Sequence, residues 1–177
     1  MGDLIKRVTT SNDVMYIELV ACFSSAYRYY EVVLDNVTPC VYDAHLRAQY
    51  GQEKGWLTES LYNTETWSND RGGSNATSDM DTSFLVYPNS RQGPTDGGVY
   101  GTMTIFNPQN ASNVPFTALL YAPIAHRSWG CQVFSGGSYL LQGSAAQLTS
   151  IRFFYDQKDA HNNSIYAGST VSIYGTA

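Results

Sequence analysis

Apolar side chains return at every second position of this chain, in short runs that end at Gly, Pro, Asn or Asp. In Tyr29–Val37, for example, Tyr30, Val32 and Leu34 occupy alternate positions. An extended strand turns successive side chains to opposite faces, whereas a helix brings every third or fourth residue to one face. The spacing therefore favours β-strands, and helical patterns are scarce.

The runs follow one another closely, without the strand–helix alternation of an α/β protein. Spacings of roughly 8–15 residues between strands are typical of a β-sandwich or a barrel. A chain of 177 residues also has the size of one domain. The expected strands are 15–23, 29–37, 45–52, 84–87, 99–106, 116–122, 127–134, 139–142, 149–155 and 170–174, with an ambiguous one at 56–62.

The links between these runs predict one hairpin and two long loops. A short polar link at 24–26 joins the first two strands, so they are expected to pair as a hairpin. Residues 63–82 offer little to bury, above all NDRGGSN at 69–75, and are expected to form an exposed loop. The Gly- and Pro-rich stretch 88–98 is expected to form a second loop.

The composition is poor in charge and rich in tyrosine. Charged residues make up 14% of the chain, against about 25% in an average soluble domain. The chain also has 14 tyrosines, which offer a large contact area at low entropic cost. A contact surface would explain this composition, but so would a β-rich core, because tyrosine and threonine favour strands.

Nucleic acid and membrane are not expected partners. The net charge is −5, and the 10 basic residues are scattered, so no basic stripe could follow a phosphate backbone. No run reaches the length of a membrane span, and residues 1–13 lack the apolar centre of a signal peptide. We therefore expect synthesis in a cytoplasm. The cysteines, Cys22, Cys40 and Cys131, lack zinc-site spacing and are expected to be buried thiols.

The sequence contains no motif of a catalytic or cofactor-binding site. The nucleophile elbow, the phosphate-binding loop, the zinc-protease helix and the dinucleotide fingerprint are all missing. The three histidines, His45, His126 and His161, are far apart in the chain. We therefore expect no enzyme activity, no cofactor and no catalytic residue.

Two pairs of carboxylates leave a question open. Asp79 with Asp81, and Asp156 with Asp159, could offer oxygen ligands to Ca²⁺. Turn-forming Asp residues that bond to their own backbone are the more common explanation, so no metal site is predicted.

Two stretches resemble virion proteins of tailed bacteriophages. YYEVVLDNVTP at 29–39, followed by HLR at 45–47, is similar to the family stretch xYYxLVxxxVxPxxDxxLxxR. IRFF at 151–154 and AGSTVSIYG at 167–175 are similar to its terminal IRxxFxxGNxxxGxIxxYGI. The family comprises capsid cement (decoration) proteins, head-fibre domains and tail-fibre tips. The chain departs from it at 157–164, which replaces a short GN turn, and at Thr176, where the family has Ile.

The resemblance implies a jelly-roll-like antiparallel β-sandwich at 15–177, preceded by an N-terminal arm at 1–14. It implies a virion location, assembly as a homotrimer, and contact with the major capsid protein or other virion proteins. A cement protein is favoured because the chain has no coiled-coil or collagen-like shaft. The alternative is a fibre tip that binds a host glycan through loops such as 70–75 and 92–98. The assembly candidates are Lys6 and Arg7 in the arm, together with Tyr29, Tyr30 and Tyr174.

Overall fold

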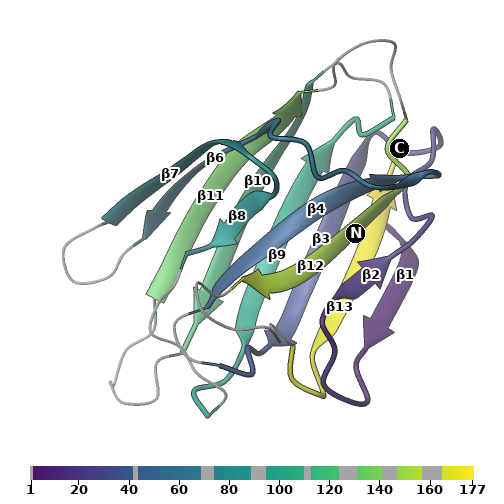
Figure 1. The fold of residues 1–177 in the computed structure, drawn as a ribbon. Coiled ribbons are helices and arrows are strands. Elements are labelled where there is room, and N and C mark those ends of the chain that lie inside the picture. The colour runs from purple at the N-terminus through teal and green to yellow at the C-terminus, as the bar shows by residue number, and fades with distance from the viewer. Residues whose placement is uncertain are drawn as a thin grey trace.

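A computed structural model describes residues 2–41, 44–68, 74–88, 95–109, 113–123, 131–140, 147–156 and 165–177, which form two antiparallel sheets (Figure 1). The larger sheet has the order β1 (Asp3–Thr9), β13 (Thr170–Thr176), β3 (Tyr29–Val37), β9 (Val99–Phe106), β10 (Asn113–Ala122), β11 (Cys131–Leu140), β6 (Tyr62–Ser68) and β7 (Ser74–Asp81). The smaller has the order β2 (Ile17–Leu19), β12 (Ser150–Asp156), β4 (His45–Gln52) and β5 (Gly55–Trp56), and β8 (Phe84–Tyr87) also pairs with β4.

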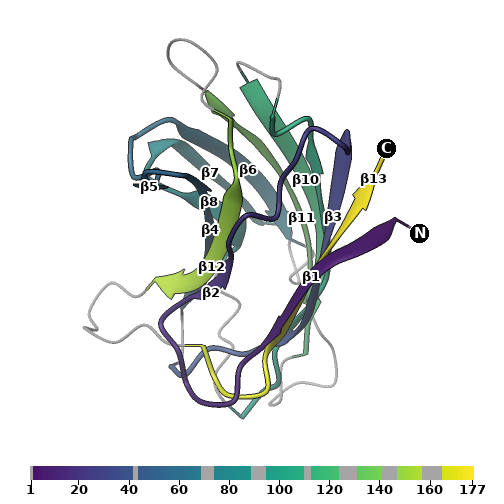
Figure 2. The same cartoon turned by 90° about the vertical axis from the view of Figure 1, so that its right-hand side faces the viewer.

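The two sheets pack face to face around one apolar core, and the larger sheet curves around the smaller (Figure 2). Alternation produces this core: along β10 every second residue is buried, from Val114 to Ala122, and the residues between them are exposed. The all-β, jelly-roll-like antiparallel sandwich in one domain is therefore confirmed. No helix long and apolar enough to cross a membrane occurs among the described residues.

Much of the tyrosine content belongs to the core. The fully buried tyrosines are Tyr30, Tyr50, Tyr62, Tyr87, Tyr139 and Tyr155. Tyr62 lies at the centre of an aromatic cluster, with ring centroids 4.7 Å from Phe84 and 4.5 Å from Tyr139. Its hydroxyl accepts from the Tyr50 amide at 3.0 Å and donates to the Leu57 carbonyl at 2.9 Å. Most of these tyrosines thus supply core volume, each with a hydroxyl that needs a partner.

The hydroxyl of Tyr50 finds no such partner among the described residues. A buried unpaired hydroxyl destabilises a fold, whereas a paired one contributes to it. Tyr50→Phe should therefore leave the free energy of unfolding unchanged or raise it by up to about 1 kcal/mol. Tyr62→Phe should lower it by about 1–3 kcal/mol, because the Tyr50 amide loses its partner. Urea denaturation of both variants tests the contrast, and equal losses would contradict it.

Two expected connections are wrong. Residues 15–23 and 29–37 do not form a hairpin: β2 pairs with β12 in the smaller sheet, whereas β3 lies between β13 and β9. Within the expected loop 63–82, residues 63–68 and 74–81 are not a loop, because β6 and β7 pair as antiparallel strands, and residues 69–73 lie outside the described residues. After Tyr62, the inward residues of β6 are Thr64, Thr66 and Ser68, which are buried but polar. A search for alternating apolar residues therefore does not detect this strand.

The segment expected to be an N-terminal arm is mostly an edge strand. Residues Asp3–Thr9 form β1, which pairs with β13. A register shift between Leu4 and Lys6 marks a β-bulge. Ile5 and Val8, three positions apart, therefore both pack against the core. The bulge breaks the period of two that identified the other strands.

Candidate functional site

The five assembly candidates do not form one surface. Arg7 and Lys6 project from opposite sides of β1: the Arg7 Nε donates to the Ser172 hydroxyl at 2.9 Å, and the Lys6 Nζ donates to the carbonyl of Val20, just after β2, at 2.9 Å. Tyr30 is buried in the core, and its hydroxyl donates to the Ser24 carbonyl at 2.7 Å.

Tyr29 and Tyr174 lie on the outer side of the larger sheet. Tyr29 is 46% exposed and packs edge-on against Phe106, at 5.8 Å between ring centroids. Tyr174 is half-buried and opposite Glu31 in the register. Tyr29 and Tyr174 are therefore available for contacts, whereas Tyr30 serves the core.

The centre of the same outer side carries a feature that sequence inspection missed. The strands β9, β10 and β11 are neighbours in the middle of the larger sheet (Figure 1), and none of them contains Asp, Glu, Lys or Arg. We call their outward side, together with Trp67 of β6, the uncharged face. Leu140 is exposed at the end of β11, and five further large side chains, each 38–50% exposed, are Trp67, Tyr100, Leu119, Tyr121 and Phe134.

The strand register brings these side chains together. Leu119 on β10 is opposite Phe134 on β11, and Phe134 is in turn opposite Trp67 on β6. Tyr121 is opposite Tyr100 on β9. The rings of Trp67 and Phe134 are 5.8 Å apart. Directly opposite residues on one face of a sheet are within contact distance, so these side chains form a continuous apolar patch on an exposed sheet.

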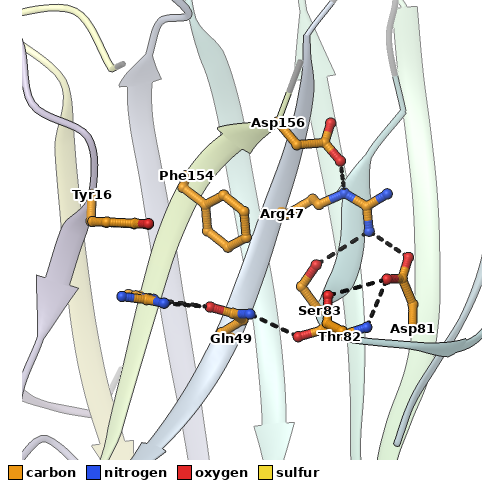
Figure 3. Close-up of a pocket in the computed structure, with 9 residues that line it drawn as sticks. Tyr16, Arg47, Gln49, Asp81, Thr82, Ser83, Phe154 and Asp156 are labelled. Carbon is orange, nitrogen blue, oxygen red and sulfur yellow. Dashed lines mark hydrogen bonds and ion pairs between the residues drawn. The ribbon is translucent and has the colours of Figure 1, made fainter. Parts of the chain in front are cut away.

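The outer side of the smaller sheet carries a different site, a solvent-open depression of about 260 Å³ (Figure 3). The Arg47 guanidinium lies between two carboxylates: it donates to Asp156, and to Asp81 at 2.7 Å. Its Nη1 also donates to the Ser83 hydroxyl at 3.2 Å. Asp81 and Asp156, one from each pair that the sequence suggested for Ca²⁺, thus bind an arginine. Asp79's side chain and Asp159 lie outside the described residues.

A second arginine occupies the other end of the depression. Arg152 donates from Nε and Nη2 to the Gln49 Oε1 at 3.0 and 2.7 Å. Its guanidinium carbon is 4.1 Å from the Tyr16 ring centroid and 4.7 Å from that of Trp56. Gln49 is held in turn, because its Nε2 donates to the Thr82 carbonyl at 2.8 Å. The depression is therefore lined by rigid planar polar groups and aromatic rings.

Arg47 should also stabilise the fold, because it joins β4 to the ends of β7 and β12. Arg47→Met would leave Asp81 and Asp156 close together without a cation, so the free energy of unfolding should fall by about 1–3 kcal/mol. Arg47→Lys should recover part of this loss, because it keeps the charge but not the planar fork. Denaturation at neutral pH measures both. A loss below about 0.5 kcal/mol for Arg47→Met, the level of an ordinary surface change, would contradict the structural role.

The described residues contain no group of three His, Cys, Asp or Glu side chains that could hold a metal ion. Of the histidines, His126 and His161 lie outside the described residues, as do 70–73 and 92–94 of the glycan-loop candidates. Comparison of this chain with protein-family models, with curated proteins and with solved structures found no match.

Proposed function

We propose that this protein is a virion structural protein of a tailed bacteriophage, a capsid cement protein that binds and stabilises the head shell as a homotrimer. The observation that carries the proposal is the uncharged face, whose exposed apolar patch is the kind of surface that a protein covers with a partner. The resemblance of 29–39, 151–154 and 167–175 to virion proteins of tailed bacteriophages supplies the setting. Neither feature requires enzyme activity.

Location on the particle tests this function directly. Virions of the phage that encodes the chain would be labelled with an antibody against it and imaged by electron microscopy. We expect label distributed over the head. Particles that lack the protein should also lose resistance to heat and osmotic shock. Absence of label, or unchanged resistance in particles that lack the protein, would contradict a cement role.

The depression on the smaller sheet favours one alternative, a glycan-binding fibre tip. Sugars are bound by planar polar side chains that pair with hydroxyls and by aromatic rings that cover their apolar faces. Arg47 and Asp81 could supply the first kind of contact, and Tyr16 and Phe154 the second. Labelled protein should then bind host cells, soluble host polysaccharide should block this binding, and Tyr16→Ala should weaken it. No binding at micromolar protein would reject the alternative.

A further inference from the structure

We infer that the uncharged face is the surface through which copies of this chain meet each other. The inference deepens the proposed function, because self-association is part of it, and it rests on that function for its setting only. The face lies on the opposite sheet from the depression, so the two sites can be tested independently.

Charge favours a second copy as the occupant. Each copy carries a net charge of −5, so two copies repel each other, and the repulsion at the contact is smallest when the surfaces that meet carry no acidic group. The uncharged face satisfies this condition. Glu65 on β6 and Glu31 on β3 are exposed to either side of it, where they can remain in water. A basic partner, a nucleic acid or an anionic membrane would be recognised by charge, which the face does not offer.

The size of the face is enough for the centre of a contact between proteins. Strands β9, β10 and β11 cover an area of about 30 by 14 Å, since strands are about 4.8 Å apart and rise about 3.3 Å per residue. This is roughly 400 Å² before Trp67 and the relief of the side chains are counted, about half of the roughly 800 Å² that each partner buries in a standard interface.

The arrangement within the face is that of an interface centre. Trp67, Phe134 and Leu119 form a row across three adjacent strands. Large aromatic residues at the centre of an interface contribute most of its affinity, and a polar rim excludes water around them. Uncharged polar residues can surround this row. They are Thr102 and Thr117, next to Leu119 on the outward side, and Gln132, next to Phe134.

Analytical ultracentrifugation of the full chain between 1 and 100 µM tests the inference. The wild-type protein should sediment as an oligomer, at two or three times the 19.5 kDa of one chain. Leu119→Arg and Phe134→Arg should each raise the dissociation constant about 30-fold or more, and the double variant should be a monomer throughout. Val20→Arg is the matched control, because Val20 is as exposed as Leu119, at 50%, but lies beside the smaller sheet, and it should associate like the wild type.

Far-ultraviolet circular dichroism and the melting temperature of the double variant, compared at equal monomer concentration, show whether it remains folded. Single Leu119→Ser and Phe134→Ser variants provide a milder second series. A wild-type chain that is monomeric at 100 µM would overturn the inference, as would an oligomer that none of the face variants weakens. Neither result decides the particle location, since a monomer could still bind a shell and an oligomer could be absent from virions.

Discussion

Raising the pH above 10 should unfold this protein cooperatively, because four buried acidic groups cannot ionise inside the fold. Burial raises the pKa of Tyr50 and of Tyr155 well above the ordinary value for tyrosine. It also raises the pKa of Tyr62, against a smaller opposite effect of the hydrogen bond from the Tyr50 backbone. Burial raises the pKa of the Cys22 thiol to about 12. Each group is neutral in the fold at a pH where the unfolded chain would release its proton.

The sign of the effect follows from proton counting. Between the unfolded and the folded pKa, the unfolded state holds fewer protons than the native state, so the free energy of unfolding falls as pH rises. The contribution is fully present below about pH 7.5, where cysteine and tyrosine are protonated in both states. Each group then lowers the free energy of unfolding by about 1.4 kcal/mol per pH unit. Above pH 10 the four groups together lower it by about 5 kcal/mol per unit. The free energy of unfolding of a domain is about 5–15 kcal/mol, so at this slope a rise of a few pH units is enough to unfold it.

Urea denaturation at pH 8, 9, 10 and 11 measures this slope, and absorbance at 295 nm follows tyrosinate formation. Tyr50→Phe is the control, because it removes one titrating group without removing a described hydrogen bond of its hydroxyl. Above pH 10 the slope should decrease by about a quarter in this variant. Stability that stays constant up to pH 11 would show that the buried hydroxyls are not protected by the fold.

The sequence predicted the sandwich because most strands bury apolar residues at alternate positions. Strand β10 is typical, since its buried and exposed residues alternate without exception. The prediction failed where the buried residues of a strand are not apolar or do not alternate with a period of two. In β6 the buried residues after Tyr62 are two threonines and a serine, whose hydroxyls can form hydrogen bonds inside the fold: the Thr64 hydroxyl accepts from the Leu85 amide at 3.3 Å. In β1 the bulge at 4–6 shifted the period.

The candidate surfaces could not be predicted because they depend on strand order and register. Trp67, Leu119 and Phe134 come from three separate runs, and their spacing along the chain does not indicate that they are neighbours on one face. Arg47 similarly meets carboxylates that lie 34 and 109 residues further along the chain. Tyr29 and Tyr30 are both assembly candidates on sequence grounds, but adjacent residues of a strand face opposite ways, and only Tyr29 is exposed.

Gly101→Ala should be among the most destabilising single substitutions in the protein. Gly101 has a φ of +136°, which residues with a side chain rarely adopt. A Cβ at this position would lie 2.2 Å from the Leu119 carbonyl oxygen and 2.9 Å from the Leu120 Cα. Both are backbone atoms of β10, and β9 is held between β10 and β3, so neither strand can move away without breaking hydrogen bonds.

We expect Gly101→Ala to lower the free energy of unfolding by about 3–6 kcal/mol, from backbone strain of about 1–3 kcal/mol and steric overlap of similar size or larger. Gly55→Ala separates the two causes, because Gly55 has a φ of +134° but a Cβ there would meet nothing within 4 Å. It should show the backbone strain alone. Gly136→Ala should lower the free energy of unfolding by less than about 1 kcal/mol, because the nearest atom to a Cβ there, the Phe116 carbonyl oxygen, would be an ordinary 3.7 Å away. If urea denaturation gave equal losses for Gly101→Ala and Gly55→Ala, the close approach of β9 and β10 would not be the cause.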